Sequence, residues 1–104
     1  MRGFDKHLHQ VLRKNPQLAA EYAGLIAKLP ITTQLAIMRR RLGLSQIRAS
    51  LRMRKPQSVV ARLEKENANP RLASLQEAAK ALSCHLVLVP DKNLDQAAQI
   101  ALRA

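Results

Sequence analysis

Ten basic side chains gather in the middle third of this chain of 104 residues. Only two acidic residues share that stretch, so its net charge is +8, out of +11 for the whole chain. A dense set of cationic groups binds polyanions, of which nucleic acid is the commonest. The alternative is a solvated basic face without a partner, but such a face usually spreads its charge and mixes the two signs. The ten residues are Arg39, Arg40, Arg41, Arg48, Arg52, Arg54, Lys55, Arg62, Lys65 and Arg71.

Side chains that do catalysis or bind metals are few and poorly spaced. His7 and His9 lie two residues apart, the wrong spacing for one face of a helix, so we expect no metal site and no cofactor. Cys84 and His85 adjoin a short apolar run, where packing is a better explanation than a nucleophile with its base. Nothing resembles a phosphate-binding loop or a catalytic carboxylate pair. The sequence therefore does not predict an enzyme.

Composition narrows the class of protein further. Hydrophobic residues make up 47% of the chain, which is enough for one small folded domain. No apolar run approaches the roughly 20 residues of a membrane span, and the first residues do not form a secretion signal. The single cysteine, Cys84, fits a reducing compartment. We therefore expect a cytoplasmic protein with no membrane partner.

The aromatic residues bear on the kind of nucleic acid. Proteins that bind single strands, and many that bind RNA, stack bases on exposed aromatic rings. This chain has only Phe4 and Tyr22, and both lie outside the basic third. Duplex DNA is therefore the favoured partner. A protein that uses the basic face without specificity, on RNA or on a membrane surface, is the competing hypothesis.

Proline, glycine and capping residues divide the chain into helices. Asn15 and Ser45 are expected N-caps, Thr32 or Thr33 a third, and the Asn69-Pro70 pair a fourth. Pro30 and Gly43 are expected to end helices. Apolar residues at helical spacing support each segment. The expected helices are 4–12, 16–29, 33–42, 46–51, 56–64, 70–82 and 94–104, with a turn at 91–93.

Residues 85–89 have a different pattern. They are apolar and partly β-branched, and Pro90 follows them, which is typical of a strand. A single strand cannot satisfy its own backbone groups. We therefore expect the same strand of a second copy to pair with it, through Leu86, Val87, Leu88 and Val89.

The order of polar residues across the basic third resembles the Xre (lambda-repressor/Cro-like) helix-turn-helix family. That family has a glutamine at the start of its first motif helix, followed by a glutamine, an arginine, a glutamate and an Asn-Pro pair at fixed offsets. Counting from Gln46, these offsets fall on Gln57, Arg62, Glu64 and Pro70. The resemblance covers roughly residues 32–89, with the motif at about 45–64.

The resemblance also has departures. Glycines that the family often has in the turn, after the glutamate and after the last helix are replaced by Arg54, Glu66 and Ser83. A non-glycine residue with positive φ costs about 1 kcal/mol, so we expect a turn that differs in detail. Small residues, Ala49 and Ser50, still allow the two motif helices to cross closely.

The resemblance implies a role for each matched residue. The second motif helix places its N-terminal residues against base edges in the major groove, while Val60 and Leu63 hold it to the core. This leaves Gln57, Ser58, Ala61 and Arg62 on or near its outward side. Gln46 is placed to bind a phosphate, and the DNA backbone is the expected contact of Arg48, Arg52, Lys55 and Arg71. Arg39 and Glu64 match positions that form a structural ion pair, and Arg40 and Arg41 are expected on a solvated face.

The flanking segments suggest a second partner. Residues 5–22 look like the leader of HigA-type antitoxins, and residues 82–90 look like the terminal strand of HipB-type antitoxins. The resemblance thus implies a bacterial, nucleoid-associated repressor that is also an antitoxin, bound to a HipA-type kinase or a HigB-type ribonuclease. The high positive charge suits an acidic kinase better than a basic ribonuclease. A stand-alone phage- or plasmid-type repressor is the alternative.

Together these observations predict an all-α protein. Residues 1–30 are expected to form an N-terminal helical extension and residues 31–84 a five-helix, lambda-repressor-like DNA-binding domain. Residues 85–90 are expected to form the dimerisation strand, which pairs across a homodimer. Residues 91–104 are expected to form a C-terminal tail.

Overall fold

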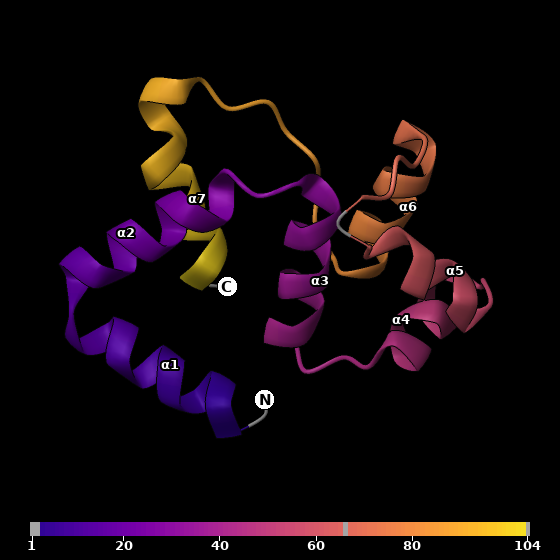
Figure 1. Ribbon diagram of the computed structural model, residues 1–104, viewed down its shortest axis with the longest axis horizontal. Helices are drawn as coiled ribbons and strands as arrows, with labels where there is room; N and C mark the ends of the chain where they lie inside the picture. The colour runs from indigo at the N-terminus through magenta and orange to yellow at the C-terminus, as the bar shows by residue number, and fades with distance from the viewer. Residues whose placement is uncertain (1–2, 66, 104) are drawn as a thin grey trace. The chain divides into compact units, whose positions relative to one another are not determined.

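The computed structural model describes residues 3–65 and 67–103 and, of the side chains before residue 10, only that of His7. All the regular elements among the described residues are helices, which confirms the all-α class (Figure 1). The helices are α1 (Gly3–Lys14), α2 (Pro16–Ala27), α3 (Ile31–Arg41), α4 (Gln46–Met53), α5 (Gln57–Leu63), α6 (Leu72–Ala81), the short 3-10 helix η1 (Asp91–Asn93) and α7 (Leu94–Arg103). Ala104, the end of the last expected helix, lies outside the described residues.

The chain divides into two compact units. One extends from Pro30 to Val87, and the other combines the residues up to Leu29 with those from Leu88 onwards. The described part of the first unit has four helices, α3 to α6, so the expected count of five is not confirmed. The helices expected from the sequence between residues 31 and 84 were already four, and residues 83–90 after α6 add no fifth, because they are not helical.

Two of the four expected helix caps are confirmed. The Asn15 side chain accepts a hydrogen bond from the Leu18 N–H at 3.1 Å, and Ser45 Oγ accepts one from the Arg48 N–H at 3.1 Å. The other two are wrong. Helix α3 begins at Ile31, directly after Pro30, so Thr32 lies inside the helix and is buried. Asn69 does not cap α6, because this helix begins later than expected, at Leu72. Its first backbone hydrogen bond runs from the Leu75 N–H to the Arg71 carbonyl.

Three helices are followed, within one or two residues, by a residue with a left-handed backbone. Gly43, Arg54 and Ser83 have φ angles of 73°, 56° and 57°. After α4, the N–H groups of Arg54 and Lys55 bond to the carbonyls of Leu51 and Ser50, and the same paired pattern follows α3 and α6. The turn after α4 thus keeps the positive φ that the family usually gives to glycine, with Arg54 in that place. Glu66 lies outside the described residues.

The core of the 30–87 unit is built from leucine and alanine. Leu35 of α3 and Leu63 of α5 are buried together with Ala78, Ala79 and Leu82 from the end of α6. Partly buried residues pack around this cluster, namely Met38, Leu44, Met53, Val59, Leu75, Cys84 and Leu86. These contacts fix α5 through its inner face and leave its other face to solvent.

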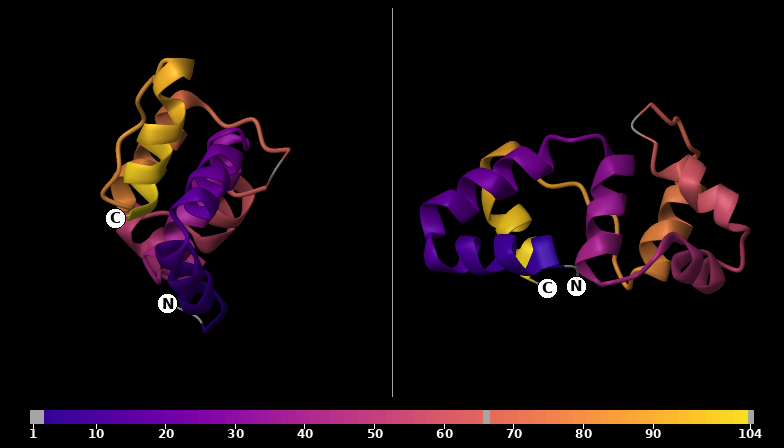
Figure 2. Two further views of the ribbon diagram at one scale, coloured as in Figure 1. Left: turned by 90° about the vertical axis from the view of Figure 1, so that its left-hand side faces the viewer. Right: turned by 60° about the horizontal axis from the view of Figure 1, so that its bottom comes forward.

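The second unit is built around the packing of α2 on α7, with α1 against α2 (Figure 2). Small residues allow the close approach. Ala23 is fully buried, and a Cβ atom added at Gly24 would lie 3.1 Å from Asp95 Oδ1. The C-terminal segment is therefore a packed helix of this unit.

The strand expected at residues 85–89 is not confirmed in the single chain. Residues 84–90 have neither helical nor strand structure in the single chain. The physical reason is that a strand exists only through hydrogen bonds to a neighbouring strand, and no described segment of the chain lies alongside as one. Leu86 packs on the core, whereas Val87 is 73% exposed and Leu88 is fully exposed.

None of the described helices has both the length and the apolar character that crossing a membrane requires.

Candidate nucleic-acid interface

Helices α4 and α5 pack against each other and are joined by the short turn at Arg54–Lys55–Pro56. The small residues Ala49 and Ser50 of α4 are buried, as expected for closely packed helices. On α5, Val60 and Leu63 are buried, which confirms that these residues hold the helix to its unit. The pair of helices is therefore anchored along one side and free on the other.

The free side of α5 has the side chains expected from the sequence. Gln57, Ser58 and Arg62 are exposed, and Ala61 is half-buried between them. The four residues lie one helical turn apart in pairs, so they share one outward face. This face presents an amide, a hydroxyl, a methyl group and a guanidinium.

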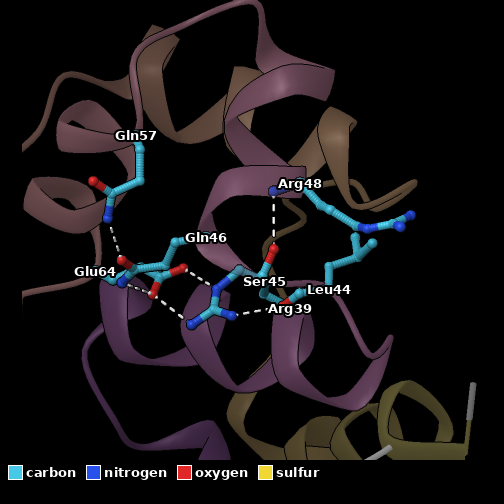
Figure 3. Close-up of polar contacts among 7 residues, drawn as sticks. All are labelled: Arg39, Leu44, Ser45, Gln46, Arg48, Gln57 and Glu64. Carbon is cyan, nitrogen blue, oxygen red and sulfur yellow. Dashed lines mark hydrogen bonds and ion pairs between the residues drawn. The ribbon is translucent and has the colours of Figure 1, made fainter.

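A buried ion pair supports the end of α5 (Figure 3). Arg39 Nε lies 2.6 Å from Glu64 Oε2, and a second Arg39 nitrogen donates to Glu64 Oε1 at 2.9 Å. The third donor, Arg39 Nη1, bonds to the Leu44 carbonyl at 2.6 Å. The two side chains are only 9% and 11% exposed. The geometry satisfies both charges, as a pair removed from water requires.

Two glutamines extend this pair to the surface of α5. Gln46 Nε2 donates to Glu64 Oε1 at 3.1 Å, and Gln57 Nε2 donates to Gln46 Oε1 at 2.8 Å. Figure 3 shows the continuous row from Arg39 through Glu64 and Gln46 to Gln57. The first residue of α4 thus connects the buried ion pair with the first residue of α5.

Comparison with protein families decides what this arrangement is. A family model described as helix-turn-helix matches residues 35–89, which is more than half of the chain and includes α4, α5 and α6. The chain belongs to the Xre-like helix-turn-helix family. It is therefore a DNA-binding regulator of transcription, of a family that is not typically enzymatic. No curated protein and no solved structure matches the chain.

In helix-turn-helix proteins the second motif helix, here α5, is the recognition helix that enters the major groove. The row of hydrogen bonds that runs from Glu64 through the Gln46 amide to the Gln57 amide was not predicted from the sequence. The offsets of eleven and eighteen residues from Gln46 were the available signal, because they selected Gln57 and Glu64 without showing that the three side chains meet.

The basic residues of the helix-turn-helix unit differ in their surroundings. Arg48, Lys55 and Arg71 are exposed. Arg52 is exposed as well, but its Nη1 donates to the Ala81 carbonyl at 3.1 Å. A cation at the last carbonyls of a helix stabilises that end, so Arg52 also supports the end of α6.

Charge is concentrated on the helix-turn-helix unit. Residues 30–87 have a net charge of +8, against +3 for the other unit. Glu64, one of the few acidic residues in residues 30–87, is neutralised by Arg39. No group of three side chains suited to bind a metal ion occurs among the described residues.

Proposed function

We propose that this protein is a sequence-specific repressor that binds double-stranded operator DNA. The observation that supports it best is the outward face of α5, which is exposed while Val60 and Leu63 bury the opposite face. A helix fixed in this way can enter the major groove as a rigid body, without first ordering its backbone.

Each of the four outward side chains of α5 has a matching base edge. The Gln57 amide pairs with adenine, the Arg62 guanidinium with guanine, and the Ala61 methyl group with the methyl of thymine, while Ser58 bonds to several bases. Phosphate contacts come from Gln46, Arg48, Arg52, Lys55 and Arg71, and they set affinity and register but not sequence.

Selection from random duplex DNA tests this proposal. The protein enriches one preferred site, and the same site as a single strand or as RNA binds much more weakly. Enrichment of no sequence, or equal binding to duplex and single strand, contradicts it and favours a non-specific basic protein.

The repressor acts as a homodimer in this proposal. Val87 and Leu88 expose apolar side chains in a segment that is neither helix nor strand in the single chain, while Leu86 packs inward. Two such segments can pair as antiparallel strands through their backbone groups, which places Val87 beside Val89 on one face and Leu88 on the other. Dimerisation then requires an operator with two inverted half-sites about one helical turn apart.

A second candidate function adds a toxin partner. Helices α1, α2 and α7 form a unit of their own outside the matched family region. Leu25 of α2 and Ile100 of α7 are about two-thirds exposed there, at 67% and 66%. Exposed leucine and isoleucine on a unit that DNA reading does not need favour an antitoxin that binds a kinase or ribonuclease in a bacterial cytoplasm.

Co-expression with the product of the adjacent gene separates the two candidates. Leu25→Glu and Ile100→Glu should abolish co-purification and restore growth arrest, with DNA binding intact. Gln17→Glu, an exposed change on α2, is the matched control. Deletion of residues 91–104 is a poorer test, because α7 packs on α2 and its loss destabilises the unit. If the unmodified protein co-purifies with no partner in this experiment, the result supports the stand-alone repressor and contradicts the antitoxin.

A further inference from the structure

Glu64 has a feature that an ion-pair partner alone does not need. Its Oε1 atom accepts hydrogen bonds from both Arg39 and Gln46, at 2.9 Å and 3.1 Å. A carboxylate can only accept hydrogen bonds, whereas a glutamine amide has an oxygen that accepts and a nitrogen that donates. The contact therefore dictates which end of the Gln46 amide faces Glu64.

The direction set at Glu64 passes to the recognition helix. The Gln46 nitrogen must face the Glu64 carboxylate, so the oxygen of the Gln46 amide faces Gln57. Gln57 meets that oxygen with its own nitrogen, at 2.8 Å. Each amide thus has one orientation in which the row of hydrogen bonds is complete, and rotating either one by half a turn places like atoms against each other (Figure 3).

We propose that Glu64 is a positioning residue for base selection, which fixes the orientation of the Gln57 amide through Gln46. The proposal rests on the proposed function, in which Gln57 contacts a base. The bond to Gln46 uses one N–H of Gln57 and leaves its oxygen and its second N–H. These two groups form one acceptor and one donor in a fixed order.

The fixed order determines which base fits. In the major groove adenine offers the N7 acceptor beside the N6 amino donor, so a donor and an acceptor in matching order bind it with two hydrogen bonds. With the amide reversed, the oxygen would face N7 and the amino groups would face each other. A free amide would sample both orders and lose part of its preference for adenine.

The experiment compares base preferences of variants by selection from random duplex DNA. Glu64→Gln keeps the size of the side chain, but the new amide can donate as well as accept hydrogen bonds. The amides of Gln46 and Gln57 are then no longer restricted to one orientation. We expect the preference at the base pair assigned to Gln57 to fall about fivefold, within the range of one bidentate contact. Other positions should keep their preferences. Glu77→Gln, an equal change of charge at an exposed residue of α6, is the matched control.

A rescue variant separates positioning from structural support. The double variant Glu64→Gln with Gln46→Glu moves the carboxylate from residue 64 to residue 46, directly next to Gln57. Because this carboxylate can only accept hydrogen bonds, the nitrogen of the Gln57 amide must again face it. We expect the lost preference to return, although overall affinity falls because a carboxylate has been added near the DNA backbone. A purely structural role for Glu64 predicts no such return.

The outcomes distinguish this inference from the proposed function. If the unmodified protein selects no site, the proposed function fails. If it selects a site that Gln57→Ala alters at one base pair, and Glu64→Gln leaves that base pair unchanged, only the positioning role of Glu64 is overturned. If Glu64→Gln does not fold, Gln46→Ala decides, because it leaves the pair of Arg39 and Glu64 intact and should relax the same base pair. An unchanged preference in Gln46→Ala overturns the inference.

Discussion

Arg39 and Glu64 lie 25 residues apart in the chain, yet two hydrogen bonds of 2.6 Å and 2.9 Å join them. Arg39 belongs to α3, and Glu64 directly follows the recognition helix α5. The pair therefore fixes the C-terminal end of α5 to the unit while the buried residues Val60 and Leu63 fix its inner face. Helix α5 is therefore held both at its end and along its side.

The ion pair should contribute measurably to stability. Arg39→Ala leaves the Glu64 carboxylate without its charged partner and removes the donor to the Leu44 carbonyl. We expect a loss of about 3 kcal/mol in the free energy of unfolding, measured by urea denaturation. Arg40→Ala, at the exposed neighbouring position, should change it by less than about 0.5 kcal/mol. Equal effects of the two substitutions would contradict the buried pair.

The N-cap of α4 offers a smaller and independent test. Ser45→Ala removes the oxygen that accepts from the Arg48 N–H, so we expect a loss of about 1 kcal/mol. Ser74→Ala, inside α6, is the control and should cost less, because alanine favours a helix interior. Thermal unfolding followed by circular dichroism measures both. A Ser45→Ala variant as stable as the unmodified protein would show that the cap contributes nothing.

The turn between the motif helices should tolerate glycine with a gain in stability. Arg54 has a φ of 56°, where glycine pays no steric cost, so Arg54→Gly should stabilise the protein by about 0.5–1 kcal/mol. Lys55→Gly, one residue later and without a positive φ, should destabilise it instead. Denaturation midpoints of the two variants should therefore move in opposite directions, and movement in the same direction would argue against strain at Arg54.

The proposed homodimer has a direct test at Val87. Proline has no N–H, so Val87→Pro removes a hydrogen bond from a strand ladder and should split a dimer held together by residues 85–89. Sedimentation velocity at micromolar concentration should show a dimer for the unmodified protein and a monomer for the variant. A monomeric unmodified protein would refute the dimer at once.

Local signals in the sequence predicted the helices well and their boundaries less well. Asn15 and Ser45 cap helices as expected, because a single side chain and a nearby N–H decide the geometry. Thr32 does not cap α3, because the helix begins directly after Pro30 and Thr32 lies inside it. From the sequence alone, a threonine in the first turn of a helix looks the same as one just before the helix. The strand at 85–89 could not be confirmed from one chain, since its definition depends on a second backbone.

The candidate site was predictable residue by residue but not as an arrangement. The register from Gln46 identified Arg62 and Glu64, and the buried pair with Arg39 was expected from the family resemblance. The bond from Gln46 to Glu64 and the contact of Arg52 with the end of α6 were not expected. Both depend on how separate helices pack, which spacing along one chain does not contain.

Protection of guanine N7 from methylation by dimethyl sulfate tests most directly whether α5 binds in the major groove, because that atom lies on the major-groove edge. The experiment uses the selected site with the unmodified protein and with Arg62→Ala. We predict protection of a guanine in each half-site by the unmodified protein, and loss of that protection in Arg62→Ala while other contacts persist. Guanines that stay fully reactive in a saturated complex would contradict major-groove recognition by α5.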